Sequence, residues 1–354
     1  MFNKIKNRDS NFELLRIISM LMIILHHFFW FSNYNFVLPY KVNDLVLIIF
    51  QSGGKIGVVL FVMITGYYMV NEKKIKIKKL FELEFQVLYY SIVLFLIFVV
   101  FFNHSFIFGD FLKVIFPNIF KLYCFFSSYF ILYLLIPYIN KFISNISKNE
   151  YKNLLVICFV FLILIPSIII INRTITDIVY LFFYYLLGGY IRLYFNDNKL
   201  KYKYLVIFLI SYSLIVVITF ILSYLSFSYN GIFNYLYSYT YMSSIFVFIC
   251  GISLFLFFKN IHLGKNKIIN YLSSFSFGVY LFHDHFYMRK VLWNNIFSLS
   301  KFLNSNFLFF KGICIAIIVY IAGCVFEFYR NLLFFLVYKL FYWYRYTIKQ
   351  IKSK

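Results

Sequence analysis

The stretch ELLRIISMLMIILHHFFWF, residues 13–31, decides the class of this protein. Most of its side chains are apolar, and its length approaches the roughly 20 residues that a helix needs to cross a hydrocarbon core of about 30 Å. Similar runs recur along the chain, which is 63% apolar and only 13% charged, with a mean hydropathy of +0.83. Because lipid offers the backbone no hydrogen-bond partner, such runs must be helical. We therefore expect an all-α, polytopic integral membrane helix bundle.

The apolar runs divide the chain into expected spans. A shorter run, 331–344, is typical of an interfacial helix, and the second span is expected to begin with a tilted or re-entrant piece near Gly53 and Gly54. We expect a single membrane domain over 1–345 and a basic tail over 346–354. The ten expected spans are 12–32, 45–70, 84–102, 122–140, 153–171, 176–195, 203–224, 236–258, 270–288 and 307–329.

The basic residues predict an orientation. The net charge is +22, but the Lys and Arg side chains lie mostly in short loops between apolar runs, which argues against nucleic-acid binding. With ten spans and the N-terminus inside, 24 of the 34 Lys and Arg fall on the cytoplasmic side and eight on the other. The positive-inside rule therefore predicts that both termini are cytoplasmic. Arg16 and Lys55 are the two basic residues that remain within spans.

Arg16 and His27 are polar residues within the apolar first span, and their presence there requires an explanation. An Arg at the centre of a membrane helix costs about 2.5–3.5 kcal/mol on insertion scales. The two residues are eleven positions apart, about three helical turns, so they share one face of the helix. They could therefore line one shared channel. Alternatively, Arg16 reaches back to the headgroups and His27 is a hydrogen-bonded core residue.

Three further groups of polar residues lie in or beside the spans. Lys55 follows a Gly pair, where it is either a site residue or an interfacial lysine beside a close helix contact. His283 and Asp284 lie near the end of the ninth span and predict a histidine oriented by a carboxylate. Glu327 and Arg330 are one turn apart and form either a simple ion pair or part of a cofactor entrance.

A metal site is not expected. His283 and His285 flank Asp284, but residues i and i+2 of a helix point to different faces. The five cysteines form no CxxC pair, so the sequence indicates neither a zinc site nor a disulfide framework.

Six motifs in order along the chain resemble the acyltransferase 3 family of membrane acyltransferases, and most closely its O-acetyltransferases of capsular and other surface polysaccharides. Two features depart from family patterns: the loop NEKKIKIKKLFE (71–82) lacks the Arg-x-x-Arg motif of some members, and no esterase-like domain is expected. The six motifs are Arg16 with His27, GVVLFVMITGYY (57–68), SSYFILYLLIPYINKFI (127–143), YYLLGGYIR (184–192), SFGVYLFH (276–283) and CVFEFYR (324–330).

The resemblance implies a reaction and roles for the polar residues. It implies transfer of an acetyl group from cytoplasmic acetyl-CoA to a hydroxyl of a capsular or exopolysaccharide, or of its lipid-linked oligosaccharide precursor, in a bacterial plasma membrane. His27 would act as general base, with an acetyl-histidine intermediate as a variant, because a sugar hydroxyl needs a base poised near neutrality. Arg16 would bind the donor through its forked guanidinium. Lys73, Lys74 and Arg330 would assist donor binding, and Lys55, His26, His283, Asp284 and Glu327 would support the acceptor or the site.

Two other functions use similar features. A polysaccharide transporter or flippase would also place Arg and His inside about ten spans, and a polymerase of lipid-linked repeats is a second alternative, although the outer loops here are short. The expected partners are the lipid bilayer, the polysaccharide acceptor and other polysaccharide-assembly proteins. Transfer of acetyl without a membrane potential would distinguish the enzyme from the transporter.

Overall fold

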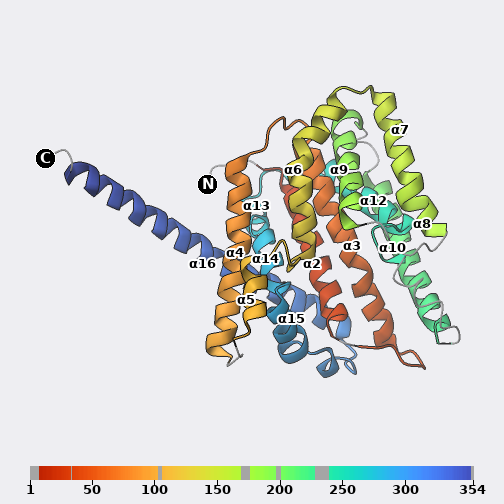
Figure 1. The fold of residues 1–354 in the computed structure, drawn as a ribbon. Helices are drawn as coiled ribbons and strands as arrows, with labels where there is room; N and C mark the ends of the chain where they lie inside the picture. The colour runs from red at the N-terminus through yellow and green to blue at the C-terminus, as the bar shows by residue number, and fades with distance from the viewer. Residues whose placement is uncertain are drawn as a thin grey trace.

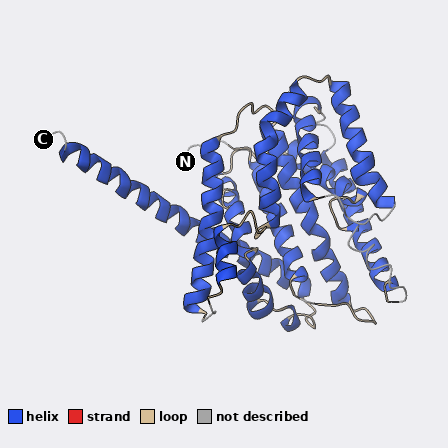
Figure 2. Cartoon of the chain, in the orientation of Figure 1, coloured by secondary structure: helices blue, strands red, loops and turns tan. Residues whose placement is uncertain are grey.

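In the computed structural model every regular element of the described residues is a helix, with no strand among them (Figure 2). The long helices stand side by side as a bundle (Figure 1). The expected all-α membrane bundle is therefore confirmed. The described residues are 8–32, 34–102, 106–168, 176–196, 201–227 and 239–351.

The helices follow the apolar runs. Besides the α-helices, the regular structure includes two π-helical turns, Val160–Leu164 and Val291–Ile296, and one 3₁₀ turn, Leu299–Lys301. The α-helices are α2 (Ser10–Trp30), α3 (Val42–Met69), α4 (Ile77–Phe101), α5 (Phe108–Ile115), α6 (Cys124–Ser144), α7 (Lys148–Phe159), α8 (Ile165–Ile168), α9 (Asp177–Tyr194), α10 (Lys201–Leu225), α12 (Ile245–Asn260), α13 (Lys267–Ser273), α14 (Ser276–His283), α15 (Phe286–Lys290) and α16 (Leu308–Ile351).

Seven of these segments are long and apolar enough to cross a membrane. They are α2, α3, α4, α6, the joined α7–α8 segment, and most of α10 and α16. Helix α12 lies within the region of the expected span 236–258; it is apolar but has only 16 residues. The first residues of that expected span lie outside the described residues. The total of ten crossings, and the side of the membrane on which the termini lie, stay predictions.

The ninth expected span is not one helix, contrary to the prediction. It is divided into α13, α14 and α15, with breaks after Ser273 and after His283. At the first break Ser274 Oγ donates to the carbonyl of Tyr271 at 2.6 Å, a bond that competes with helix propagation. At the second, His285 has an extended backbone, with φ −64° and ψ 136°. The three short pieces have different neighbours: α13 packs against α2, α14 against α2 and α16, and α15 against α4.

Two other expectations about helix continuity are also wrong. Helix α3 runs through Gly53 and Gly54 without a break, so no re-entrant piece is present. The run 331–344 is not a separate helix, because α16 continues for 44 residues from Leu308 to Ile351. No Gly or Pro occurs between Cys324 and Ile351 to stop it. The C-terminal part of α16 projects away from the bundle (Figure 1).

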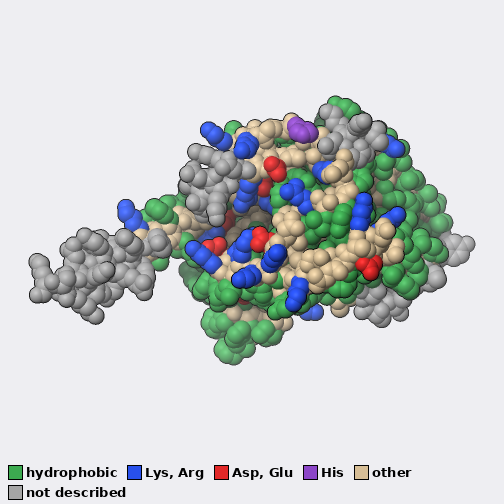
Figure 3. All heavy atoms as spheres, turned by 90° about the horizontal axis from the view of Figure 1, so that it is seen from above, with side chains coloured by type: hydrophobic (Ala, Val, Ile, Leu, Met, Phe, Trp, Pro, Cys, Tyr) green, Lys and Arg blue, Asp and Glu red, His purple; other side chains and the backbone are tan. Residues whose placement is uncertain are grey.

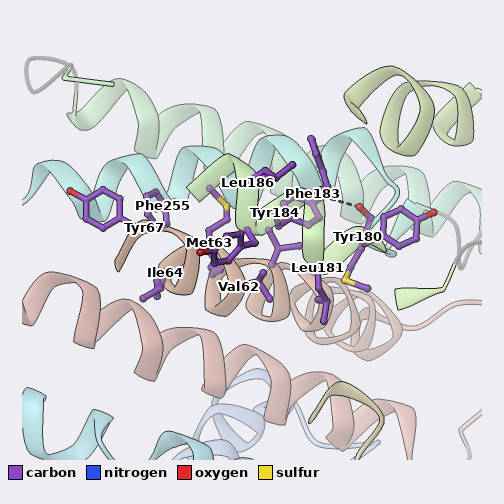
Figure 4. Packing of buried hydrophobic residues seen from close by; sticks show 14 of the residues in the cluster. Val62, Met63, Ile64, Tyr67, Tyr180, Leu181, Phe183, Tyr184, Leu186 and Phe255 are labelled. Carbon is purple, nitrogen blue, oxygen red and sulfur yellow. Dashed lines mark hydrogen bonds between the residues drawn. The ribbon is translucent and has the colours of Figure 1, made fainter. Parts of the chain in front are cut away.

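The core is built around α3, which packs against α2, α9, α10 and α12. Figure 4 shows part of the buried cluster, in which Met63 and Tyr67 of α3 lie among Tyr184 of α9 and Phe255 of α12. Lipid tails are as apolar as these side chains, so close packing rather than water exclusion must hold such helices together. The sequence meets this need with small residues on the inner faces.

The crossing of α3 and α9 shows how close that approach is. A Cβ added to Gly66 would overlap the carbonyl oxygen of Tyr185, and one added to Gly188 would overlap the carbonyl oxygen of Met63. These obstacles are backbone atoms, which cannot turn aside. The two glycines therefore set the distance between two helices that both contribute residues to the cavity described below.

Candidate active site

One cavity, of about 390 Å³, runs along a face of α2. That volume falls within the range of small-molecule sites in proteins. From α2 it is lined by residues three or four positions apart, from Arg16 through Met20, Ile23 and His27 to Trp30. This is the single helical face that the spacing predicts for Arg16 and His27. We call the end of the bundle at which α2 begins the Arg16 end, and the other the Trp30 end.

The Arg16 end of the cavity is cationic. Arg8, Arg16 and Lys79 line it, and Figure 3, which looks down on this end, shows Lys and Arg side chains gathered around a hollow. Below them lies the buried carboxylate of Glu13, which accepts from Arg16 Nη1 at 3.0 Å and from Ser273 Oγ at 2.5 Å. Arg8 Nη1 reaches the same carboxylate at 3.4 Å. Three cations against one carboxylate leave this end with a positive charge that suits an anionic ligand.

Further along the cavity, His27 of α2 meets His283 of α14. His283 Nε2 lies 3.1 Å from His27 Nδ1, and the two ring centroids are 5.1 Å apart. His283 Nδ1 in turn lies 2.6 Å from the carbonyl oxygen of Val279, one turn earlier in α14. His283 is fully buried, whereas His27 lines the cavity. The two rings join segments that are 256 residues apart in the chain.

Asp284 lies beside this pair without bonding to it. Its Oδ1 is 3.7 Å from His27 Nδ1, beyond a hydrogen bond. The same oxygen accepts from Arg289 Nε at 3.0 Å and Nη2 at 2.9 Å. Asp284 and Arg289 both line the cavity, and the Arg289 guanidinium also stacks on the ring of Phe31. His283, which the sequence predicted to be oriented by a carboxylate, is instead bonded to the Val279 carbonyl and to His27, because Arg289 binds the Asp284 carboxylate.

His26 has a different setting from its neighbour. Its Nδ1 donates to the carbonyl oxygen of Gln51 at 2.8 Å, and its ring stacks on Trp30 with an interplanar angle of 12°. The ring occupies the space over Gly54, where a Cβ would overlap its Cγ. His26, Gly54 and Trp30 line the cavity, so this stack forms part of the wall near the Trp30 end.

Lys55 also lines the cavity. Its ammonium lies 4.8 Å from the centre of the Tyr241 ring, and the Tyr241 hydroxyl donates to Asp177, another lining residue. The expected membrane lysine is thus part of the site wall, set against the ring of Tyr241.

Four expected site residues lie away from the cavity. Glu327 and Arg330 form a closed cluster, in which the buried carboxylate accepts from Arg330 Nη2 at 2.6 Å and from Tyr90 Oη at 2.9 Å. Lys73 and Lys74 are exposed in the loop between α3 and α4. None of the four lines the cavity. The assignment of Lys73, Lys74 and Arg330 to donor binding, and of Glu327 to a supporting role, stays a prediction.

Sequence reasoning missed three cavity or support residues. Glu13 was visible as an acidic residue one turn before Arg16, a spacing that places the two side chains together. The sequence around Asp177 and Arg289 did not indicate that they are site residues, because both lie at the edges of apolar runs, where charged residues are common. Among the described residues, no group of three or more His, Cys, Asp or Glu could hold a metal ion.

The family model described as an acyltransferase domain, that of acyltransferase 3, matches residues 9–347. The chain belongs to the acyltransferase 3 family. It is therefore a membrane acyltransferase, and the match takes in the whole cavity apart from Arg8. No curated protein and no solved structure matches the chain.

Proposed function

We propose that this membrane acyltransferase moves an acetyl group from acetyl-CoA to a hydroxyl of a capsular or other cell-surface polysaccharide, or of its lipid-linked precursor. The observation that carries the proposal is the single cavity with Arg16 near one end and the His27 ring further along the same helix face. In the proposed orientation both termini are cytoplasmic in a bacterial plasma membrane. The donor then enters at the Arg16 end, and the acceptor approaches from the Trp30 end.

The charges at the Arg16 end support the donor assignment. Phosphate groups of CoA would meet Arg8, Arg16 and Lys79, and a guanidinium presents paired donors that match phosphate oxygens. Glu13 engages one edge of the Arg16 guanidinium, which fixes its direction and leaves its other N–H groups for the ligand. Lys79 extends this cationic surface from α4, in place of the arginine motif that the loop lacks.

His27 supplies the chemistry as a general base. The acceptor hydroxyl oxygen attacks the thioester carbonyl carbon while its proton passes to the neutral His27 ring. A carbon–oxygen bond forms, the carbon–sulfur bond breaks, and the CoA thiolate leaves. The thiolate then takes the proton from His27 and departs as the thiol. The products are the sugar ester and CoA, and the histidine returns to its neutral state.

The test uses the host's own polysaccharide. A deletion strain is complemented with the wild-type gene, with His27→Ala, or with His262→Ala, a matched control in an exposed loop between α12 and α13. Protein levels in the membrane are equalised, and O-acetyl ester per repeat unit is measured by proton NMR. We expect the deletion and His27→Ala to lose the ester with polymer amount unchanged, and His262→Ala to restore it. Loss of surface polymer in the deletion, or full acetylation by His27→Ala, would contradict the proposal.

A further inference from the structure

The contact between His27 and His283 determines where protons lie on both rings. The carbonyl oxygen of Val279 can only accept, so His283 Nδ1, at 2.6 Å, must carry a hydrogen. His283 is fully buried and no carboxylate of the described residues is bonded to it, so a charged ring there would be uncompensated. The neutral ring therefore has its lone pair on Nε2.

The next link of the chain is His27. Its Nδ1 faces the lone pair of His283 Nε2 at 3.1 Å, so this nitrogen must donate. The hydrogen of a neutral His27 ring is then on Nδ1, and the lone pair is on Nε2. Asp284 cannot replace His283 in this arrangement, because its Oδ1 is 3.7 Å from His27 Nδ1 and is bound by Arg289.

We propose that His283 is a positioning residue that fixes His27 in the Nδ1–H tautomer, so that Nε2 of His27 is the atom that takes the proton of the acceptor hydroxyl. This inference rests on the proposed function of His27 as base. The backbone of α14 anchors this arrangement. The carbonyl of Val279, one turn before His283, sets the tautomer of the His283 ring, and that ring sets the tautomer of His27.

A neutral orienting group has a consequence for the reaction. In serine hydrolases a carboxylate orients the histidine and stabilises its charged form. Here the orienting atom is an imidazole nitrogen, and the carboxylate of Asp284, 3.7 Å from His27 Nδ1, is paired with Arg289 and not bonded to the histidine. His27 thus stays neutral until the hydroxyl proton arrives, and it passes that proton on to the thiolate readily.

The matched pair of variants is His283→Gln and His283→Met. Gln and Met have similar length and shape, but the amide oxygen of Gln is a strong acceptor for the hydrogen bond from His27 Nδ1, whereas the thioether sulfur of Met is only a weak one. Acetyl transfer is measured with purified protein in nanodiscs, radiolabelled acetyl-CoA, and the host polysaccharide freed of esters by mild alkali. We expect His283→Gln to keep at least about a tenth of the wild-type rate. We expect His283→Met to lose about 10²–10⁴-fold, the range contributed by general base catalysis.

A spectroscopic readout tests the tautomer without activity. Protein labelled with ¹⁵N-histidine is examined by solid-state NMR, and the His27 signals are assigned by their loss in His27→Asn. We expect wild type and His283→Gln to show hydrogen on Nδ1 and a lone pair on Nε2, and His283→Met to show the second tautomer as well.

The outcomes separate the two proposals. A wild-type His27 with its hydrogen on Nε2 overturns the inference, whether or not the Met variant folds. Equal transfer rates in the Gln and Met variants also overturn it. If wild-type protein transfers no acetyl while its His27 shows the Nδ1–H tautomer, the proposed function falls and the relation between the two histidines stands.

Discussion

Gly54→Ala should disturb the site through the fixed ring of His26. A Cβ on residue 54 would overlap His26 Cγ and lie only 2.7 Å from its Cβ and Nδ1. Overpacking of this kind costs about 1–3 kcal/mol, and loss of the bond to the Gln51 carbonyl costs about 1 kcal/mol more. Replacing Gly by Ala within a helix returns about 1 kcal/mol. The net effect on the free energy of unfolding is a loss of about 1–3 kcal/mol.

The neighbouring Gly53 provides the matched control. Its added Cβ would meet Met22 atoms at 3.3 Å and the Tyr212 hydroxyl at 3.4 Å, contacts that a shift of a few tenths of an ångström relieves. We expect Gly53→Ala to change stability by less than about 1 kcal/mol, because the helix-propensity gain offsets the crowding. Unfolding of both variants is followed in mixed micelles by SDS titration, and acetyl transfer is measured in parallel. Equal stability and equal activity of the two variants would refute the packing described for His26.

Four further variants, one of them a control, test the charges. Arg16→Lys should lower transfer at least about tenfold, because one ammonium cannot both hold Glu13 and present a fork to phosphate; full activity would remove the fork from the mechanism. Lys79→Met should raise the KM for acetyl-CoA by up to about fivefold, the value of an exposed charge contact, whereas Lys73→Met should not; an equal effect of both would place the donor elsewhere. Arg330→Met should destabilise the protein by about 3–5 kcal/mol, because it leaves a buried carboxylate without its cation. Thermal unfolding would show this loss, and a variant as stable as wild type would argue against a charged Glu327.

Part of the candidate site could be predicted from the sequence. The spacing of Arg16 and His27 predicted one helical face, and both line the cavity. For Glu327 and Arg330 the sequence left open an ion pair or part of a cofactor entrance, and the structure shows the ion pair, in a closed cluster that does not line the cavity. A one-turn spacing shows that two side chains meet, but it does not show which way the pair faces.

The ninth span illustrates the same limit for secondary structure. Its apolar composition predicted a continuous helix, because hydropathy averages over a window and does not register a local break. The break after Ser273 lies beside two side-chain bonds, that of Ser274 with the Tyr271 carbonyl and that of Ser273 with Glu13, 260 residues away. Between the two breaks, α14 carries His283, which contacts His27.

The sequence by itself determined the membrane class, the positions of most helices and the face shared by Arg16 and His27. Lipid forces apolar runs into helices, and helical periodicity is a property of neighbouring residues. The tertiary structure alone decided that His283, and not Asp284, contacts His27. It also decided that Arg8, Arg16 and Lys79 open onto one cavity. These relations depend on how each helix is rotated and how closely it approaches its neighbours, and that is set by packing across the whole bundle.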